Sequence, residues 1–222
     1  MQFHQYTAVV NSVGDAFGFP FRDPKWIEKI LIQGLILIIP IVGVIALAGW
    51  MLITFDNLRA GRQELAPAGF DLSRGIGLFG AWLIYSLVLS LPGDVLSGVG
   101  GSFNASHNFS GNGFTSLGSL LGLAAQLLLY FLLPSIIVMT YHRGFSGGMD
   151  VDGVWRLATR NMNSSVMAGL IMFVAGILGA IGIVACCIGV FFTGVYAAAV
   201  MTGAASWFER QQALPAGAPP AV

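Results

Sequence analysis

All ten Lys and Arg residues of the chain fall in four short polar segments, which are separated by long uncharged stretches. Residues 30–55, 75–93, 95–142 and 161–208 contain no Asp, Glu, Lys or Arg. Only 9% of the chain is charged and its mean hydropathy is +0.80, whereas an average globular domain has about 25% charged residues. Because a charge at the centre of a bilayer costs about 2.5–3.5 kcal/mol, this pattern predicts an all-α, polytopic integral membrane protein.

The lengths of the uncharged stretches predict the number of crossings, since about 20 helical residues cross a hydrocarbon core. The last stretch is long enough for two helices, at about 164–184 and 189–208. Helices at about 75–93 and 116–141 form a second hairpin, and their connecting loop, residues 92–115, contains no Lys or Arg. Under the positive-inside rule this loop is external and the basic segments are cytoplasmic.

Residues 24–58 allow two interpretations. A single tilted helix would place the first basic segment outside, whereas a hairpin bent at Pro40 to Gly43 keeps all ten basic residues inside. We therefore expect helices at about 24–39 and 41–58, the first hairpin being short or re-entrant. In total, the chain is expected to form about six helical segments arranged as three hairpins.

An Asp precedes each of the three expected hairpins. Asp23 is followed by Pro24, and Asp71 and Asp152 occupy equivalent positions before the second and third hairpins. Asp is favoured as a helix N-cap and Pro at the first helical position, so each of these Asp residues is expected to cap a helix.

The chain is expected to form a single membrane domain, residues 22–211, between two terminal segments. Residues 1–21 have neither the basic nor the apolar region of a secretory signal and are expected to be interfacial or cytoplasmic. Residues 212–222, rich in Pro and Ala, are expected to form a disordered tail.

The composition speaks against several classes of function. A formal net charge of zero provides no basic surface for nucleic acid. The three His residues are scattered, and the pair Cys186-Cys187 has no further Cys to join, while a metal site needs three or four convergent ligands. We therefore expect no nucleic-acid partner, no metal and no cofactor.

One segment resembles a hydrolase motif. Residues 144–148 read Gly-Phe-Ser-Gly-Gly, which matches the Gly-x-Ser-x-Gly turn that carries a nucleophile. That turn needs a strand before it and a helix after it, whereas Ser146 follows an expected membrane helix in a Gly-rich segment. We expect a flexible loop here and a protein that is not an enzyme.

A few residues inside the expected helices are candidates for helix contacts or for a path. Gln126 lies in the middle of an apolar helix, where its amide either hydrogen-bonds another helix or lines a polar path. Pro134 is expected to kink the same helix. Small residues recur at contact spacing in Gly118-x-x-x-Gly122 and in a stripe that contains Gly176 and Gly179. A stripe of this kind packs internally or, if it faces lipid, forms an assembly surface.

Several motifs make the chain similar to the prokaryotic membrane proteins of the domain of unknown function 4013 family. They are Phe21-Arg22-Asp23-Pro24-Lys25-Trp26, Leu31-Ile32-Gln33-Gly34-Leu35, Ile39-Pro40-Ile41-Val42-Gly43, Gly49-Trp50, Asn57-Leu58-Arg59-Ala60-Gly61, Met149 to Leu157 with Asn161, and Ile188-Gly189-Val190-Phe191-Phe192-Thr193. Where members of the family tend to carry an acidic Leu-Pro-x-Trp segment, this chain has residues 65–70. The resemblance implies a prokaryotic cytoplasmic-membrane protein and implies no activity.

The expected function is based on the absence of transport and nucleotide-binding motifs from the sequence. The membrane segments contain no ionisable acidic or basic residue of the kind that ion-coupled transporters use, and no nucleotide-binding motif is present. We expect a non-enzymatic integral membrane subunit or scaffold that assembles with itself or with a partner membrane complex within the lipid bilayer. The alternative is a permease- or channel-like component for an uncharged or lipidic substrate.

Overall fold

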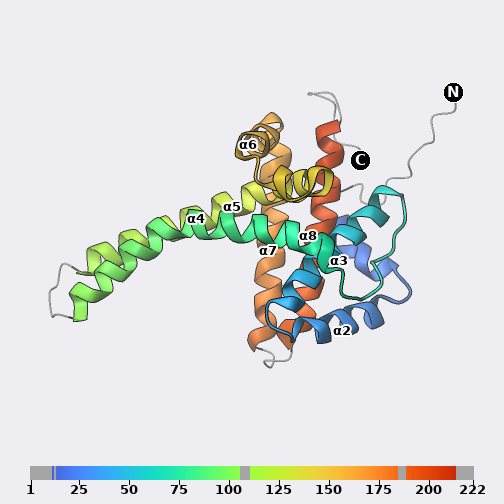
Figure 1. Ribbon diagram of the computed structural model, residues 1–222, viewed down its shortest axis with the longest axis horizontal. Helices are drawn as coiled ribbons and strands as arrows, with labels where there is room; N and C mark the ends of the chain where they lie inside the picture. Colours follow the sequence, from blue (N-terminus) through green and yellow to red (C-terminus); the bar gives the residue numbers. More distant parts are fainter. Residues whose placement is uncertain (1–11, 13, 106–110, 185–188, 214–222) are drawn as a thin grey trace.

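A computed structural model describes residues 12, 14–105, 111–184 and 189–213. Within these residues the chain is helical and contains no strand, which confirms the predicted all-α membrane fold (Figure 1). The elements are α1 (Asp15–Gly18), η1 (Phe19–Arg22), α2 (Trp26–Leu37), α3 (Val42–Arg59), α4 (Leu72–Ala105), α5 (Gly111–Gly148), α6 (Val151–Arg160), α7 (Met162–Val184) and α8 (Gly189–Ala213).

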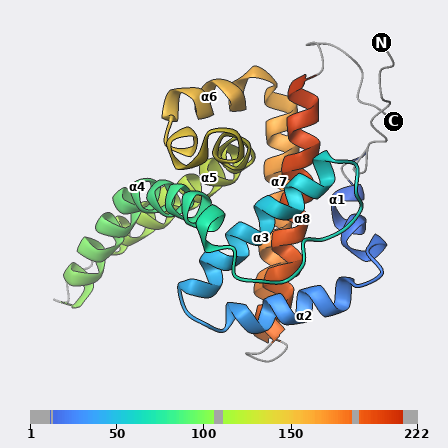
Figure 2. The same cartoon turned by 45° about the vertical axis from the view of Figure 1, so that its right-hand side comes forward.

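Five of the helices are long and apolar enough to cross a membrane, namely α3, α4, α5, α7 and α8. Figure 2 shows α7 and α8 side by side, with α6 near one of their ends and α2 near the other. Helix α8 is the central element, because it contacts α1, α2, α3, α5 and α7. The chain is therefore a multi-pass membrane protein.

The first hairpin bends at Pro40, where the sequence predicts a break. Helix α2 ends at Leu37 and α3 begins at Val42, and between them Ile41 adopts a φ of 65°, which is rare for a β-branched residue. With 12 residues, α2 rises about 18 Å, well short of a hydrocarbon core of about 30 Å. The expected cap is wrong here, since the N-cap residue of α2 is Lys25 and no side chain caps the helix.

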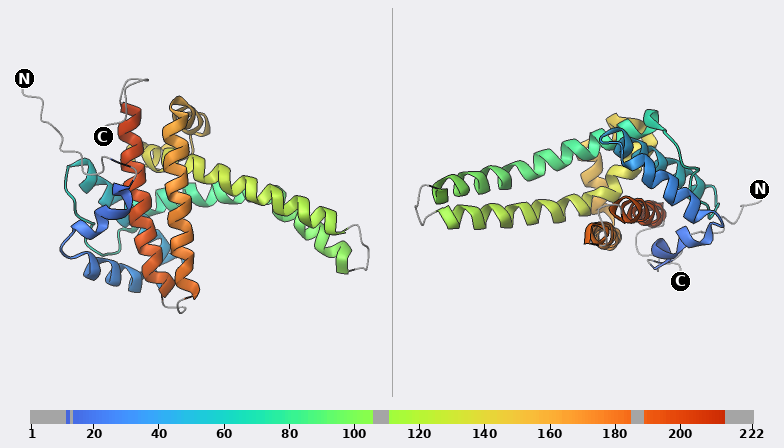
Figure 3. Two further views of the ribbon diagram at one scale, coloured as in Figure 1. Left: turned by 180° about the vertical axis from the view of Figure 1, so that it is seen from behind. Right: turned by 90° about the horizontal axis from the view of Figure 1, so that it is seen from below.

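The second hairpin is longer than expected. Helix α4 has 34 residues and α5 has 38, so most of residues 92–115, expected to be a loop, is helical, and residues 106–110 lie outside the described part. The backbones of α4 and α5 approach closely at Gly93, since a Cβ on this residue would collide with Gly118 and Gly122. This α4–α5 hairpin, which we call the arm, projects away from the other helices (Figures 1 and 3).

Beyond the arm the chain reverses at Gly144, whose φ of 66° suits a residue without a side chain. The short helix α6 then lies against α5 and buries Val154 and Ala158. Its N-cap is Asp150, which accepts a hydrogen bond from the Gly153 backbone N–H at 3.0 Å. The expectation that Asp152 caps this helix is therefore wrong.

The glycine stripe of α7 packs internally. Gly169 and Gly176 lie against Tyr130 of α5, and Gly179 lies against Ala197 of α8. The Thr193 hydroxyl of α8 donates a hydrogen bond to the Gly179 carbonyl at 2.8 Å. These contacts allow the backbones of α5, α7 and α8 to approach closely, as is common between membrane helices.

Candidate functional site

An apolar cavity of about 510 Å³ lies where the arm meets the rest of the molecule. Five helices form its wall. Helix α3 contributes Val44, Leu47, Ala48 and Met51; α4 contributes Leu78, Phe79, Trp82 and Ser86; α5 contributes Gln126, Leu129, Tyr130, Leu133 and Ile137; α7 contributes Gly176 and Gly179; and α8 contributes Gly194, Ala197, Ala198 and Met201.

The polar groups in this wall are few and uncharged. No Asp, Glu, Lys, Arg or His is among the lining residues just named. The Ser86 hydroxyl is buried and has no hydrogen-bond partner within the described part of the chain. The Gln126 side chain is exposed on the chain surface beside the cavity, and it makes no hydrogen bond to another described residue. The cavity therefore has a mainly apolar wall, and among its uncharged polar groups those of Ser86 and Gln126 are left without a partner by the described part of the chain.

The structure separates the six residues singled out from the sequence into two groups. Gln126, Gly176 and Gly179 line the cavity. Gly118 and Gly122 lie further out along the arm, where Gly93 of α4 packs closely against both.

Pro134, the sixth of these residues, is buried within α5, and the helix continues through it. The break in α5 occurs instead at Gly144. Sequence reasoning missed Ser86, although a hydroxyl in the middle of an apolar helix is the same kind of signal that Gln126 gave.

A polar cluster joins α3, α4 and α5 at the root of the arm. The carboxylate of Asp56 pairs with the Arg74 guanidinium and accepts a hydrogen bond from the Tyr141 hydroxyl. The Arg59 guanidinium lies 5.2 Å from the centre of the Tyr141 ring, at a distance typical of a cation–π contact. Because α3 ends here and α4 begins here, Arg59 and Arg74, which flank residues 60–71 within one basic segment, belong to the same cluster.

A second acidic residue connects this cluster to α8. Glu209 forms an ion pair with Arg59 at 3.2 Å, and its other oxygen lies 2.6 Å from Nε2 of His142. Three of the four basic segments of the sequence therefore gather at one end of the molecule.

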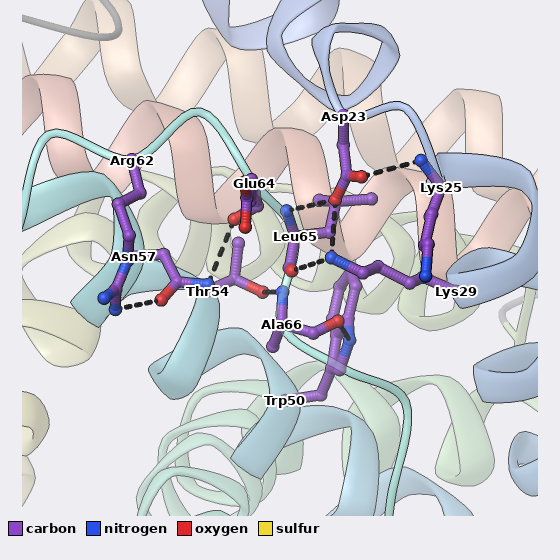
Figure 4. Close-up of polar contacts among 10 residues, drawn as sticks. All are labelled: Asp23, Lys25, Lys29, Trp50, Thr54, Asn57, Arg62, Glu64, Leu65 and Ala66. Atoms are coloured by element: carbon purple, nitrogen blue, oxygen red, sulfur yellow. Dashed lines mark hydrogen bonds and ion pairs between the residues drawn. The ribbon is translucent and has the colours of Figure 1, made fainter.

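The remaining basic segment is tied to the connection between α3 and α4 (Figure 4). One oxygen of Asp23 accepts hydrogen bonds from the Leu65 backbone N–H at 2.8 Å and from Lys29 Nζ at 2.7 Å. Lys29 Nζ also donates to the Leu65 carbonyl at 2.6 Å. Burial raises the pKa of Asp23, but the hydrogen bonds from Lys29 and from the Lys25 and Leu65 backbone outweigh it, so the pKa lies below its usual value.

The same connection is held from the side of α3. The Trp50 indole donates to the Ala66 carbonyl at 3.0 Å, and the Thr54 hydroxyl accepts from the Ala66 backbone N–H at 3.1 Å (Figure 4). One turn further on, the Asn57 amide donates to the Glu64 carbonyl at 3.1 Å. These bonds keep residues 64–66 packed between α2 and α3.

The hydrolase-like segment shows no catalytic pairing within the described residues. The Ser146 hydroxyl donates to the Arg143 carbonyl at 3.1 Å, and His142 points to Glu209. In the same part of the chain no group of three or more His, Cys, Asp or Glu side chains comes together, and Cys186 and Cys187 lie outside it.

Comparison with known proteins gives one match. The model of a family described as protein of unknown function (DUF4013) matches residues 32–204, which run from α2 into α8 and include the whole cavity wall. No curated protein and no solved structure matches the chain. The match covers most of the sequence, and the chain therefore belongs to the DUF4013 family.

Proposed function

We propose that this protein is a non-enzymatic integral membrane subunit or scaffold that assembles, with itself or with a partner membrane complex, through its arm. The main support is that few residues of α4 are covered by the rest of the chain. Within its apolar membrane-spanning stretch 22% of the residues are buried, whereas the corresponding share is 44–56% in the other four spans. Large apolar side chains are exposed along the arm: Leu87, Val88, Leu91, Val95, Leu117, Leu120, Leu121 and Leu123. A surface of this kind is suited to packing against another membrane helix.

We further propose that the protein resides in the prokaryotic cytoplasmic membrane with its basic segments in the cytoplasm. The clustering of Arg59, Arg74 and His142 around Asp56, Tyr141 and Glu209 supports a common side for these segments. The positive-inside rule assigns that side to the cytoplasm. The tip of the arm then faces the opposite compartment.

Site-specific crosslinking in membranes tests assembly through the arm. In a background with Cys186 and Cys187 changed to Ala, Val88→Cys places a thiol on the arm and Leu170→Cys places one on α7; the native side chains are 61% and 56% exposed. Treatment with a bismaleimide is expected to give a crosslinked product with Val88→Cys and little with Leu170→Cys. Equal yields from the two positions, or none from either, would contradict the proposal.

The cavity favours a second candidate, a permease- or channel-like component for an uncharged or lipidic substrate. Its support is the position of Gln126, which lies on the wall of an uncharged cavity without a partner among the described residues. Intramembrane polar residues often mark substrate paths. Gln126→Leu is then expected to abolish substrate passage while leaving the Val88→Cys crosslink intact; loss of the crosslink alone would assign Gln126 to packing.

A further inference from the structure

The cavity is large enough for a ligand of substantial size. Binding sites for small molecules typically measure about 300–1,000 Å³, and an apolar cavity of only about 150 Å³ already takes up small apolar ligands. The cavity at the root of the arm measures about 510 Å³ and is formed entirely by helices that are apolar enough to lie in a membrane. Lipid is therefore the most abundant ligand that could reach this cavity.

The wall selects against charged headgroups. It consists mainly of aliphatic, aromatic, methionine and glycine positions together with Ser86 and Gln126, and it has no cationic side chain to pair with a phosphate or carboxylate and no anionic one to pair with an ammonium. A buried charge without such a partner is strongly disfavoured. A hydrocarbon chain, in contrast, gains contact with residues from all five helices.

Besides the Tyr130 hydroxyl and the Trp82 indole N–H, two uncharged polar side chains, Ser86 and Gln126, interrupt the apolar wall. The hydroxyl of Ser86, on α4, is buried without a partner among the described residues, and the amide of Gln126, on α5, lies beside the same cavity. Both can donate and accept hydrogen bonds. A ligand hydroxyl or ester would satisfy them, whereas the backbone of a helix from a second copy would not, because its N–H and C=O groups already bond to one another.

We infer that this cavity binds a neutral lipid, with one hydrocarbon chain against the apolar wall and an uncharged hydroxyl or ester group at Ser86 and Gln126. A neutral lipid would be the substrate class for the permease- or channel-like function proposed above. Binding itself does not depend on that function, because a lipid that stays in the cavity and one that passes through it would make the same contacts; only transport of the lipid rests on it.

Photolabelling tests the site. The probe is a diacylglycerol with a diazirine in its acyl chain, added to phosphatidylcholine vesicles that contain the full-length protein. After irradiation, labelled peptides are expected to carry the probe at Met51, Trp82 or Met201, all in the wall. Unlabelled diacylglycerol should compete with the probe, and phosphatidylglycerol should not. Labelling that cannot be saturated, or that phosphatidylglycerol displaces equally well, would overturn the inference.

Two serines provide a matched pair of variants. The Ser86 and Ser135 hydroxyls are both buried and both without a partner in the described residues, but only Ser86 lines the cavity. Ser86→Ala is expected to weaken saturable labelling about three- to tenfold, because one hydrogen bond to the lipid is lost, whereas Ser135→Ala should leave it unchanged. Equal effects of the two substitutions would overturn the inference.

A cavity-filling variant gives an independent readout. Ala198→Phe places a ring in the cavity and is expected to abolish labelling; gel filtration must show that this variant keeps the elution volume of the native protein. If Ala198→Phe does not fold, the comparison of Ser86→Ala with Ser135→Ala tests the site on its own. In the protein without Ser86→Ala or Ala198→Phe, absence of saturable labelling together with a retained Val88→Cys crosslink overturns the lipid site alone, and absence of the crosslink together with retained labelling overturns assembly through the arm alone.

Discussion

The carboxylate of Asp23 accepts a hydrogen bond from the backbone N–H of Leu65, 42 residues further along the chain, at 2.8 Å. Lys29 completes the arrangement by donating both to Asp23 and to the Leu65 carbonyl. The segment before α2 is thus joined to the segment after α3, and the open end of the first hairpin is closed. This contact provides a precise test of what holds α2 in place.

Removing the carboxylate should be costly, because Asp23 is buried and Lys29 would lose its counterion. Asp23→Ala is expected to lower the free energy of unfolding by about 3–5 kcal/mol, measured by titration with sodium dodecyl sulfate in mixed micelles. The control is Asp152→Ala, which breaks the exposed pair with Arg156 and should cost about 0–1 kcal/mol. Similar losses for both would show that the Asp23 contact is not structural.

Acidification should weaken the same contact. The pKa of Asp23 in the folded chain lies below its usual value of 3.8, because its hydrogen bonds outweigh the effect of burial. A carboxyl whose folded pKa is lowered contributes stability that is fully present above the unfolded pKa and is lost as the pH falls through the folded pKa. The native protein is therefore expected to lose stability below about pH 3.8, and Asp23→Asn should lose less over the same range. Parallel curves for the two proteins would refute this assignment.

Gly75 should be intolerant of a side chain. A Cβ at this position would collide with the Ile45 carbonyl and with the backbone N of Gly49, since α4 crosses α3 there. Gly75→Ala is expected to force the helices apart and to lower the free energy of unfolding by about 1–3 kcal/mol. Gly98→Ala, further along α4 with no atom near its added Cβ, should instead stabilise by about 0.5–1 kcal/mol. The prediction fails if Gly75→Ala is neutral.

The Tyr141 hydroxyl should contribute one hydrogen bond to the root of the arm. Tyr141→Phe removes its bond to Asp56 but keeps the ring against Phe55 and Arg59, so a loss of about 1 kcal/mol is expected in the same titration. Tyr85→Phe is the matched control, because the Tyr85 hydroxyl is buried without a partner among the described residues. No loss is expected for the control, and a larger loss for Tyr85→Phe than for Tyr141→Phe would contradict the assignment.

Many of the helix positions could be predicted from the sequence, because charged residues and Pro mark helix ends locally. The break at Pro40 and the start of α8 lie where the sequence predicts them, and the expected start of α7 at residue 164 is two residues late. The ends of α4 and α5 could not be predicted in this way. Gly, Ser and Asn are weak helix formers, and the pairing of Gly93 with Gly118 that accompanies the helix here depends on the register of two helices.

The candidate site could be predicted only in part from the sequence, because it too depends on how separate helices pack together. Gln126 is conspicuous as an amide in an apolar segment, but nothing local indicates that it shares a cavity with Ser86, which is on the other helix of the arm. The pairing of Asp56 with Tyr141 spans 85 residues and depends on how α3 meets α5. Contacts of this range are set by tertiary packing and leave no periodic pattern in the chain.

The two long hairpins differ in length, which has a consequence for the surrounding bilayer. The 34 residues of α4 extend about 51 Å and the 23 residues of α7 about 35 Å, whereas the hydrocarbon layer is about 30 Å thick. Helices of such unequal length cannot both stand upright with matched ends, so α4 and α5 have to incline, emerge from the membrane or distort the lipid around them. The thickness of the host bilayer would then govern how far the tip of this hairpin reaches, and the protein would respond to lipid composition through that mismatch.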